Sequence, residues 1–216
     1  MSPSPHPAVI RTAVDQLLRE RPQIWRGYST ATTPAVATGH SGLDRLLPGC
    51  GWPLGAVSEL YPHGEGFGEL SLLLPALRRI ACADARQVVL IRPPHIPYAP
   101  ALVNAGLPLR RLMWLAPDTD EEAQWAAEQT LRAGAAGAVL LWTQVEANVP
   151  MRRLQLAAEE GQSLSFVYRP PRMLRNPSPA AVRLALHPAT NAVRVDVVKA
   201  RGGHGGSALC PLRCAA

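Results

Sequence analysis

The chain has 216 residues, 47% of them hydrophobic, and a formal net charge of +6. This length fits one domain with a sizeable hydrophobic core, and no apolar run approaches the ~20 residues that cross a membrane. Residues 1–7 (MSPSPHP) offer neither the basic region nor the apolar stretch of a secretory signal, so we expect a cytoplasmic protein without a membrane partner.

Charge is unevenly distributed along the chain. Residues 1–150 carry a net charge of −1, and residues 151–216 carry +7. A basic segment of this kind predicts an anionic partner, either a nucleic acid or an acidic protein surface, although the same residues also suit a solvated surface. The candidate residues for binding a partner or DNA are Arg152, Arg153, Arg169, Arg172, Arg175, Arg183, Lys199 and Arg201.

The residue types that carry catalysis or bind metals do not occur at recognisable spacings. The four cysteines show no disulfide framework, and His204, Cys210 and Cys214 supply at most three zinc ligands near one another. No Ser/His/Asp or Cys/His set matches a recognisable catalytic arrangement. The sequence therefore predicts reduced thiols, no metal and no catalytic residue.

In chain order, the first predicted element is a helix over residues 7–21, where apolar residues repeat at helical spacing until Pro22. Residues 27–37 lack periodicity and are interpreted as a linker. The chain thus divides into an N-terminal helix and linker (1–37), a core (38–203) and a glycine-rich tail (204–216) that we expect to be flexible without a partner.

The core alternates predicted strands and helices. This alternation predicts an α/β fold in which a mostly parallel central sheet is flanked by helices on both faces. Residues 182–186 and 193–198 alternate apolar and polar side chains around a turn, and predict an antiparallel hairpin at the C-terminal end of the sheet. The expected strands are 56–61, 88–91, 112–115, 138–142 and 164–168, and the expected helices are 70–81, 98–105, 120–133 and 150–160.

A glycine-rich loop follows the first of these strands and precedes a helix, which is the setting of a phosphate-binding P-loop. When Gly68 is aligned with the second glycine of G-x-x-x-x-G-K-[ST], Glu69 replaces the lysine and Leu70 replaces the hydroxyl residue. A carboxylate at this place would repel phosphate groups, so no nucleotide or other cofactor is predicted. The degenerate loop consists of Gly64, Glu65, Gly66, Phe67, Gly68, Glu69 and Leu70.

Short segments around this loop resemble the ATPase core of the RecA recombinase, over roughly residues 36–203. The resemblance implies a RecA-like core, and it implies that the helix over residues 7–21 either docks on a neighbouring subunit or packs on its own core. The segments are 38–39 (TG), 42–44 (GLD), 51–55 (GWPLG), 59–61 (ELY), 104–107 (NAGL), 117–123 (PDTDEEA), 151–154 (MRRL) and 197–199 (VVK).

A closer resemblance is to the ImuA family, which comprises RecA-like accessory proteins of bacterial mutagenic translesion synthesis and is related to the SulA-type cell-division inhibitors. The matching segments are 39–40 (GH), 51–53 (GWP), 72–77 (LLLPAL), 93–102 (PPHIPYAPAL), 125–129 (WAAEQ), 153–159 (RLQLAAE) and 201–203 (RGG). The resemblance implies a scaffold protein of SOS-induced translesion DNA synthesis. Its implied partners are an inactive Y-family polymerase relative (ImuB), an error-prone replicative-type polymerase that is reached indirectly, and RecA or DNA as further candidates.

Departures from the RecA pattern indicate that ATP hydrolysis is lost. Pro94 stands where the RecA resemblance places the catalytic glutamate, and Trp142 stands where it places the Walker B aspartate. Phosphoryl transfer depends on positioning and charge stabilisation, so the loss of these groups together with the P-loop lysine predicts a protein that is not an enzyme. Residues 169–179, with three arginines among four prolines, lie where RecA has its second DNA-contacting loop and predict a contact surface.

Three alternatives stay open. The first is a SulA-like cell-division inhibitor that would cap a tubulin-like filament, although inhibitors of that type are shorter and lack the long basic C-terminal third. The second is a working ATP-dependent recombinase. The third is a plain DNA-binding module, for which the basic segment is the only support.

Overall fold

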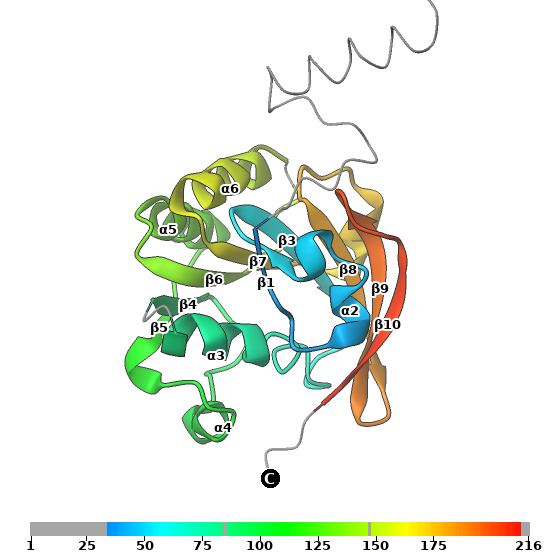
Figure 1. The fold of residues 1–216 in the computed structure, drawn as a ribbon. Coiled ribbons are helices and arrows are strands. Elements are labelled where there is room, and N and C mark those ends of the chain that lie inside the picture. The colour runs from blue at the N-terminus through cyan, green and yellow to red at the C-terminus, as the bar shows by residue number, and fades with distance from the viewer. Residues whose placement is uncertain (1–33, 84–85, 147, 213–216) are drawn as a thin grey trace, which may run out of the picture. The chain divides into compact units, whose positions relative to one another are not determined.

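A computed structural model describes residues 34–83, 86–146 and 148–212 (Figure 1). The predicted N-terminal helix over residues 7–21 lies outside the described residues, as does most of the predicted linker. The described part is a mixed α/β fold with a central, mostly parallel sheet, as the alternation of strands and helices predicts.

The central sheet has eight strands in the order β10-β9-β8-β3-β7-β6-β4-β5. The six strands from β3 to β8 run parallel to one another, and β9 and β10 pair antiparallel at one end. The strands are β3 (Ala56–Pro62), β4 (Gln87–Ile91), β5 (Leu112–Leu115), β6 (Ala136–Trp142), β7 (Leu164–Tyr168), β8 (Val182–Ala189), β9 (Ala192–Ala200) and β10 (Gly206–Pro211). The five predicted parallel strands and the β8–β9 hairpin are therefore confirmed.

Helices cover both faces of the sheet (Figure 1). The α-helices are α2 (Ser41–Asp44), α3 (Leu74–Ala83), α4 (Ala99–Asn104), α5 (Asp120–Arg132) and α6 (Asn148–Gly161), and short 3-10 turns are η1 (Pro48–Cys50), η2 (Leu109–Arg111) and η3 (Pro171–Arg175). Strand alternation sets the two layers: Leu140 of β6 packs in the core with α3, while Leu141 packs in the core with α5 and α6.

Local interactions explain where α5 and α3 begin. Thr119 and Glu122 form a capping box, in which each side chain accepts a hydrogen bond from the backbone N–H of the other residue. The predicted helix over residues 70–81 begins later, at Leu74, because the chain first makes tight turns in which the N–H of Leu72 donates to the carbonyl of Gly68.

Two sequence expectations are wrong at the ends of the core. The tail expected to be flexible forms β10, which pairs with β9 and alternates buried Ala208 and Cys210 with exposed Leu209. The end of the predicted linker forms a short strand, β1 (Ala35–Val36), which pairs antiparallel with β2 (Trp52–Pro53). In both places, pairing with another strand orders a segment that has little local preference of its own.

Candidate functional site

A cavity of about 530 Å³ opens at the carboxyl ends of four parallel strands, β3, β4, β6 and β7. Its walls include the glycine loop after β3, Pro93 and Pro94 after β4, Trp142 at the end of β6, and Tyr168 at the end of β7. Ligands of open α/β sheets bind at this edge. The cavity therefore marks the place where a nucleotide would be expected.

The glycine loop binds its own carboxylate. The backbone N–H of Gly66 donates to Oε1 of Glu69, and the N–H of Gly68 donates to Oε2, both at 3.1 Å. Gly66 and Gly68 have φ values of +72° and +102°, which only glycine adopts readily. Successive backbone N–H groups in such a loop form an anion-binding concavity, and here the Glu69 side chain occupies it.

Apolar contacts hold the loop on the core. Phe67 and Leu70 pack against the buried cluster on the α3 side of the sheet. A Cβ atom added to Gly68 would lie 2.5 Å from the side chain of Leu212, just beyond β10. The C-terminal segment thus backs the degenerate loop.

An aromatic pair forms part of the cavity wall. The rings of Trp142 and Tyr168 stack with centroids 4.5 Å apart and planes 2° from parallel. The Tyr168 hydroxyl donates to the carbonyl of Glu69 over 3.1 Å, and burial raises the pKa of Tyr168 well above its ordinary value, so the phenol stays protonated. Trp142, which stands where the RecA resemblance places the Walker B aspartate, thus presents an indole to the cavity.

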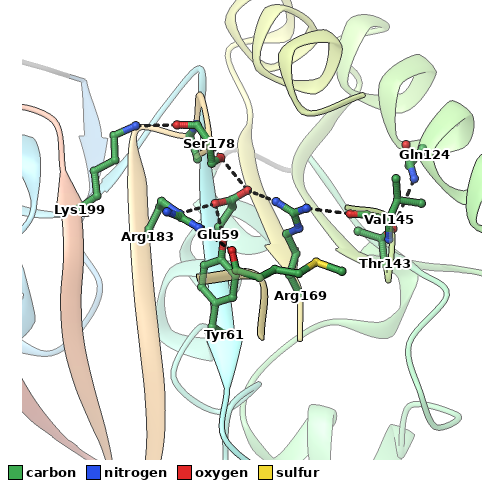
Figure 2. Close-up of polar contacts among 11 residues, drawn as sticks. Glu59, Tyr61, Gln124, Thr143, Val145, Arg169, Ser178, Arg183 and Lys199 are labelled. Carbon is green, nitrogen blue, oxygen red and sulfur yellow. Dashed lines mark hydrogen bonds and ion pairs between the residues drawn. The ribbon is translucent and has the colours of Figure 1, made fainter. Parts of the chain in front are cut away.

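Behind the cavity, a buried carboxylate joins three elements of the fold (Figure 2). Glu59 on β3 is fully buried and accepts hydrogen bonds from Arg169 at the end of β7 and Arg183 on β8, each over 2.8 Å. Its oxygens also accept from the hydroxyls of Tyr61 (2.6 Å) and Ser178 (2.8 Å). We call these five residues the Glu59 network.

The prediction that Arg169 and Arg183 bind a partner or DNA is wrong, because both belong to the Glu59 network. Arg169 and Arg183 are only 2% and 7% exposed and are committed to Glu59, so they are not surface contacts for DNA or a partner. Arg169 also donates to the carbonyl of Val145, and Arg183 donates to that of Met173. Both arginines therefore fix the loops that surround the cavity.

A sequence signal for the Glu59 network existed. Glu59 stands in the middle of a strand predicted to be buried, and an ionised carboxylate is almost never fully buried without a partner. Its two arginine partners, however, lie more than a hundred residues away in sequence. The hydrophobic pattern of the strand predicts that Glu59 needs a cationic partner, but it does not identify which arginine is that partner.

The other six candidate residues lie on several elements. Arg152 and Arg153 are exposed on α6, Arg172 and Arg175 are exposed on η3, Arg201 is exposed after β9, and Lys199 is half-buried on β9. Several already have partners: Arg153 pairs with Glu128 at 2.8 Å, Arg172 donates to Gln144 at 3.0 Å, and Lys199 donates to the carbonyl of Ser178 at 2.9 Å. Burial, reinforced by Arg201 and Arg183, lowers the pKa of Lys199.

Within residues 34–83, 86–146 and 148–212, no cluster of three or more His, Cys, Asp or Glu side chains could hold a metal ion. Cys50 and Cys82 are exposed free thiols, and Cys210 is a buried one. None of the helices in the same residues is both long and apolar enough to cross a membrane.

Comparisons with known proteins give a consistent set of relatives. No family model matches the chain. The protein named cell division inhibitor SulA from Edwardsiella piscicida is 35% identical over 116 residues, which are 54% of this chain and 68% of that protein. The protein of the same name from Photorhabdus laumondii is 31% identical over 112 residues, which are 52% of this chain and 63% of that protein.

A crystal structure of SulA from Pseudomonas aeruginosa shares 30% sequence identity with this chain, with a TM-score of 0.45. The match covers 52% of this chain and 96% of that chain. Each similarity thus involves about half of this chain, and the curated relatives are matched over about two thirds of their own length.

Proposed function

The chain belongs to the family of the SulA cell division inhibitors, and from this membership we propose that it is a non-catalytic, cytoplasmic protein of the DNA-damage response that acts by binding other proteins. The observation that carries the proposal is the occupied glycine loop. Glu69 fills two of the backbone donors that a phosphate would need, and Trp142 and Pro94 replace the groups that would hold Mg²⁺ and position water.

The nucleotide part of this proposal has a direct test. Equilibrium dialysis of the full chain against Mg·ATP is expected to show no binding, because the loop amides are already paired and Glu69 would repel the phosphates. Saturable ATP binding would contradict the proposal and would favour an ATP-dependent recombinase instead.

The first candidate function is inhibition of cell division, supported by the names of the relatives. On this proposal the chain caps a tubulin-like division filament. Its overproduction in the parent bacterium should then produce long, undivided cells within a few generations, and purified chain should reduce filament formation by the division protein.

The second candidate is the accessory role in translesion synthesis. Two observations favour it: 46% of this chain lies outside the match to the Edwardsiella protein, and a hairpin and an added strand are ordered as β8, β9 and β10. The partners would be the inactive Y-family polymerase relative and, through it, an error-prone polymerase. RecA and DNA are further candidates.

One pair of measurements separates the candidates. Deletion of the gene should abolish damage-induced mutation if the chain assists translesion synthesis, and should leave it unchanged if the chain only blocks division. Overproduction should lengthen the cells if the chain blocks division, and should leave cell length unchanged if the chain only assists translesion synthesis. Normal mutation together with normal cell length would refute both.

Binding to the polymerase relative is best tested with exposed arginines rather than by truncation. Arg172 and Arg175 on η3 are exposed, and their replacement by glutamate should weaken binding in isothermal titration without loss of folding. Arg45, exposed on a different element, provides the matched charge-reversal control. Equal affinities of all three variants would exclude η3 as the contact surface.

A further inference from the structure

A second cavity is lined in part by Leu70, the last residue of the glycine loop, and by Ser71. It has a volume of about 950 Å³ and is lined by α3, α4 and the segment that contains Gly39. Leu74 and Pro75 on one wall and Ala101 and Leu102 on the other make it largely apolar. We call this cavity the α3–α4 groove.

Contacts between α3 and the turn after α4 fix the two walls of the groove relative to each other. The side chain of Arg78 on α3 lies directly over Gly106, where an added Cβ atom would come within 2.8 Å of its Cδ. The Sγ of Cys82 on α3 lies 3.9 Å from the carbonyl of Gly106. The turn after α4 is therefore held against α3, and the groove is a built feature of the fold.

The rim of the groove exposes large apolar side chains. Tyr98, which lines the groove, is 71% exposed, and the neighbouring Ile96 and Val103 are 75% and 52% exposed. Large exposed apolar side chains beside a cavity are typical of a site that binds another molecule. Aromatic side chains such as Tyr98 are common anchors in these sites.

The charged side chains that line the groove are positive. Arg78 and Arg79 line it, and both are exposed and form no ion pair with any residue that the structure describes. None of its lining residues, all of them within the described part of the chain, is Asp or Glu. Two guanidinium groups that have no ion-pair partner among the described residues, beside an apolar surface, complement a carboxylate next to large apolar side chains.

We propose that the α3–α4 groove binds a short segment of a partner protein in which acidic and large apolar residues adjoin. The apolar side chains of the segment fill the groove between Leu74 and Ala101, and its carboxylates pair with Arg78 and Arg79. This inference rests on the proposed function, because it gives the protein-binding role a surface and a partner chemistry.

The test uses the full chain and a phage library of random peptides. Selected peptides should combine Asp or Glu with nearby Leu, Ile, Phe or Trp, and a fluorescent synthetic copy should bind in anisotropy titrations. The double variant Arg78→Glu/Arg79→Glu should weaken that binding about tenfold or more, whereas the control Arg45→Glu should not. Thermal melting verifies that each variant folds.

A second variant tests the apolar half of the inference without changing charge. Ala101→Trp introduces an indole from the α4 wall and should block the same peptide. Enrichment of peptides without acidic residues, or unchanged binding by either variant, would overturn the inference.

Two other occupants are distinguishable by a competition experiment and a sedimentation experiment. Competition by a synthetic peptide of residues 1–33 would assign the groove to this chain's own N-terminal segment, and a dimer that Arg78→Glu/Arg79→Glu dissociates in sedimentation would assign it to a second copy. Either result overturns a partner segment as the occupant. These readouts are independent of mutation frequency and cell length, so failure of the groove and failure of the proposed function are separable.

Discussion

Replacement of Glu59 by glutamine tests the central electrostatic arrangement. Glu59 is fully buried and accepts from two guanidinium groups and two hydroxyls. Its loss leaves Arg169 and Arg183 as buried cations without a counter-charge. Removing one partner of a buried ion pair costs about 3–5 kcal/mol, and the presence of two cations places Glu59→Gln towards the upper end of that range.

The assay is urea unfolding at neutral pH, followed by circular dichroism. With a urea dependence of about 2–3 kcal/mol/M, a cost of about 4–5 kcal/mol should lower the midpoint for Glu59→Gln by about 1.3–2.5 M without a change in slope. The exposed Arg175 provides a control, since Arg175→Gln should change stability by less than about 0.5 kcal/mol.

An asymmetry within the Glu59 network makes the reasoning refutable. Arg183→Met removes one cation but leaves Glu59 paired with Arg169 and hydrogen-bonded by Tyr61 and Ser178. This variant should therefore cost less, about 2 kcal/mol. If Arg183→Met is as destabilising as Glu59→Gln, the excess of buried positive charge is not what governs the cost.

Three further predictions address other groups. Burial and, to a smaller extent, the neighbouring Glu59 carboxylate raise the pKa of Tyr61 from 10.0 to about 12. The folded state therefore holds this proton more tightly than the unfolded state, so the stability that is present below pH 10 should be lost as the pH rises to 12. Urea titrations at alkaline pH should show a shallower loss of stability for Tyr61→Phe. Glu69→Lys should bind inorganic pyrophosphate at least about tenfold more tightly than the unaltered chain, because it frees two loop amides and adds a cation; equal calorimetric affinities would show that these amides do not form an anion site. In a Cys214→Ser background, Cys50 and Cys82 should react quickly with a thiol reagent, and Cys210 should react only after unfolding, because burial raises the pKa of its thiol to about 11.

The parallel core was predictable because its central strands, such as β4, β6 and β7, are buried on both faces, although the edge strand β5 exposes Met113 and Trp114. Continuous apolar runs such as 138–141 have no other stable placement in a chain of this length, and the helix starting at Asp120 carries its capping residues in sequence. Strand β10 was missed because glycines and a proline border it, while only Ala208 and Cys210 mark its buried face. Its order comes from pairing with β9.

The sequence located the candidate site through a glycine loop that lacks the residues of a P-loop. The replacement of lysine by Glu69 and of aspartate by Trp142 is legible in sequence, but the consequence of each depends on tertiary contacts. Glu69 turns back onto Gly66 and Gly68, and Trp142 stacks on Tyr168. Composition likewise grouped Arg169 and Arg183 with surface arginines, because charge in sequence does not distinguish a solvated cation from one paired in the core.

The carboxyl edge of the sheet is organised by side chains where a nucleotide would organise it in an ATPase. Glu69 binds the loop after β3, Arg169 binds the carbonyl of Val145 after β6, and Asp120 accepts from the N–H of Gln144. In P-loop proteins, phosphate and Mg²⁺ order such loops and release them after hydrolysis. Here the contacts are hydrogen bonds of the chain's own side chains, so this edge forms without a bound ligand. Under the proposed function, an edge ordered in this way suits constant binding of a partner, and the proposal therefore predicts that the effect of the chain rises with the amount of it that the cell makes.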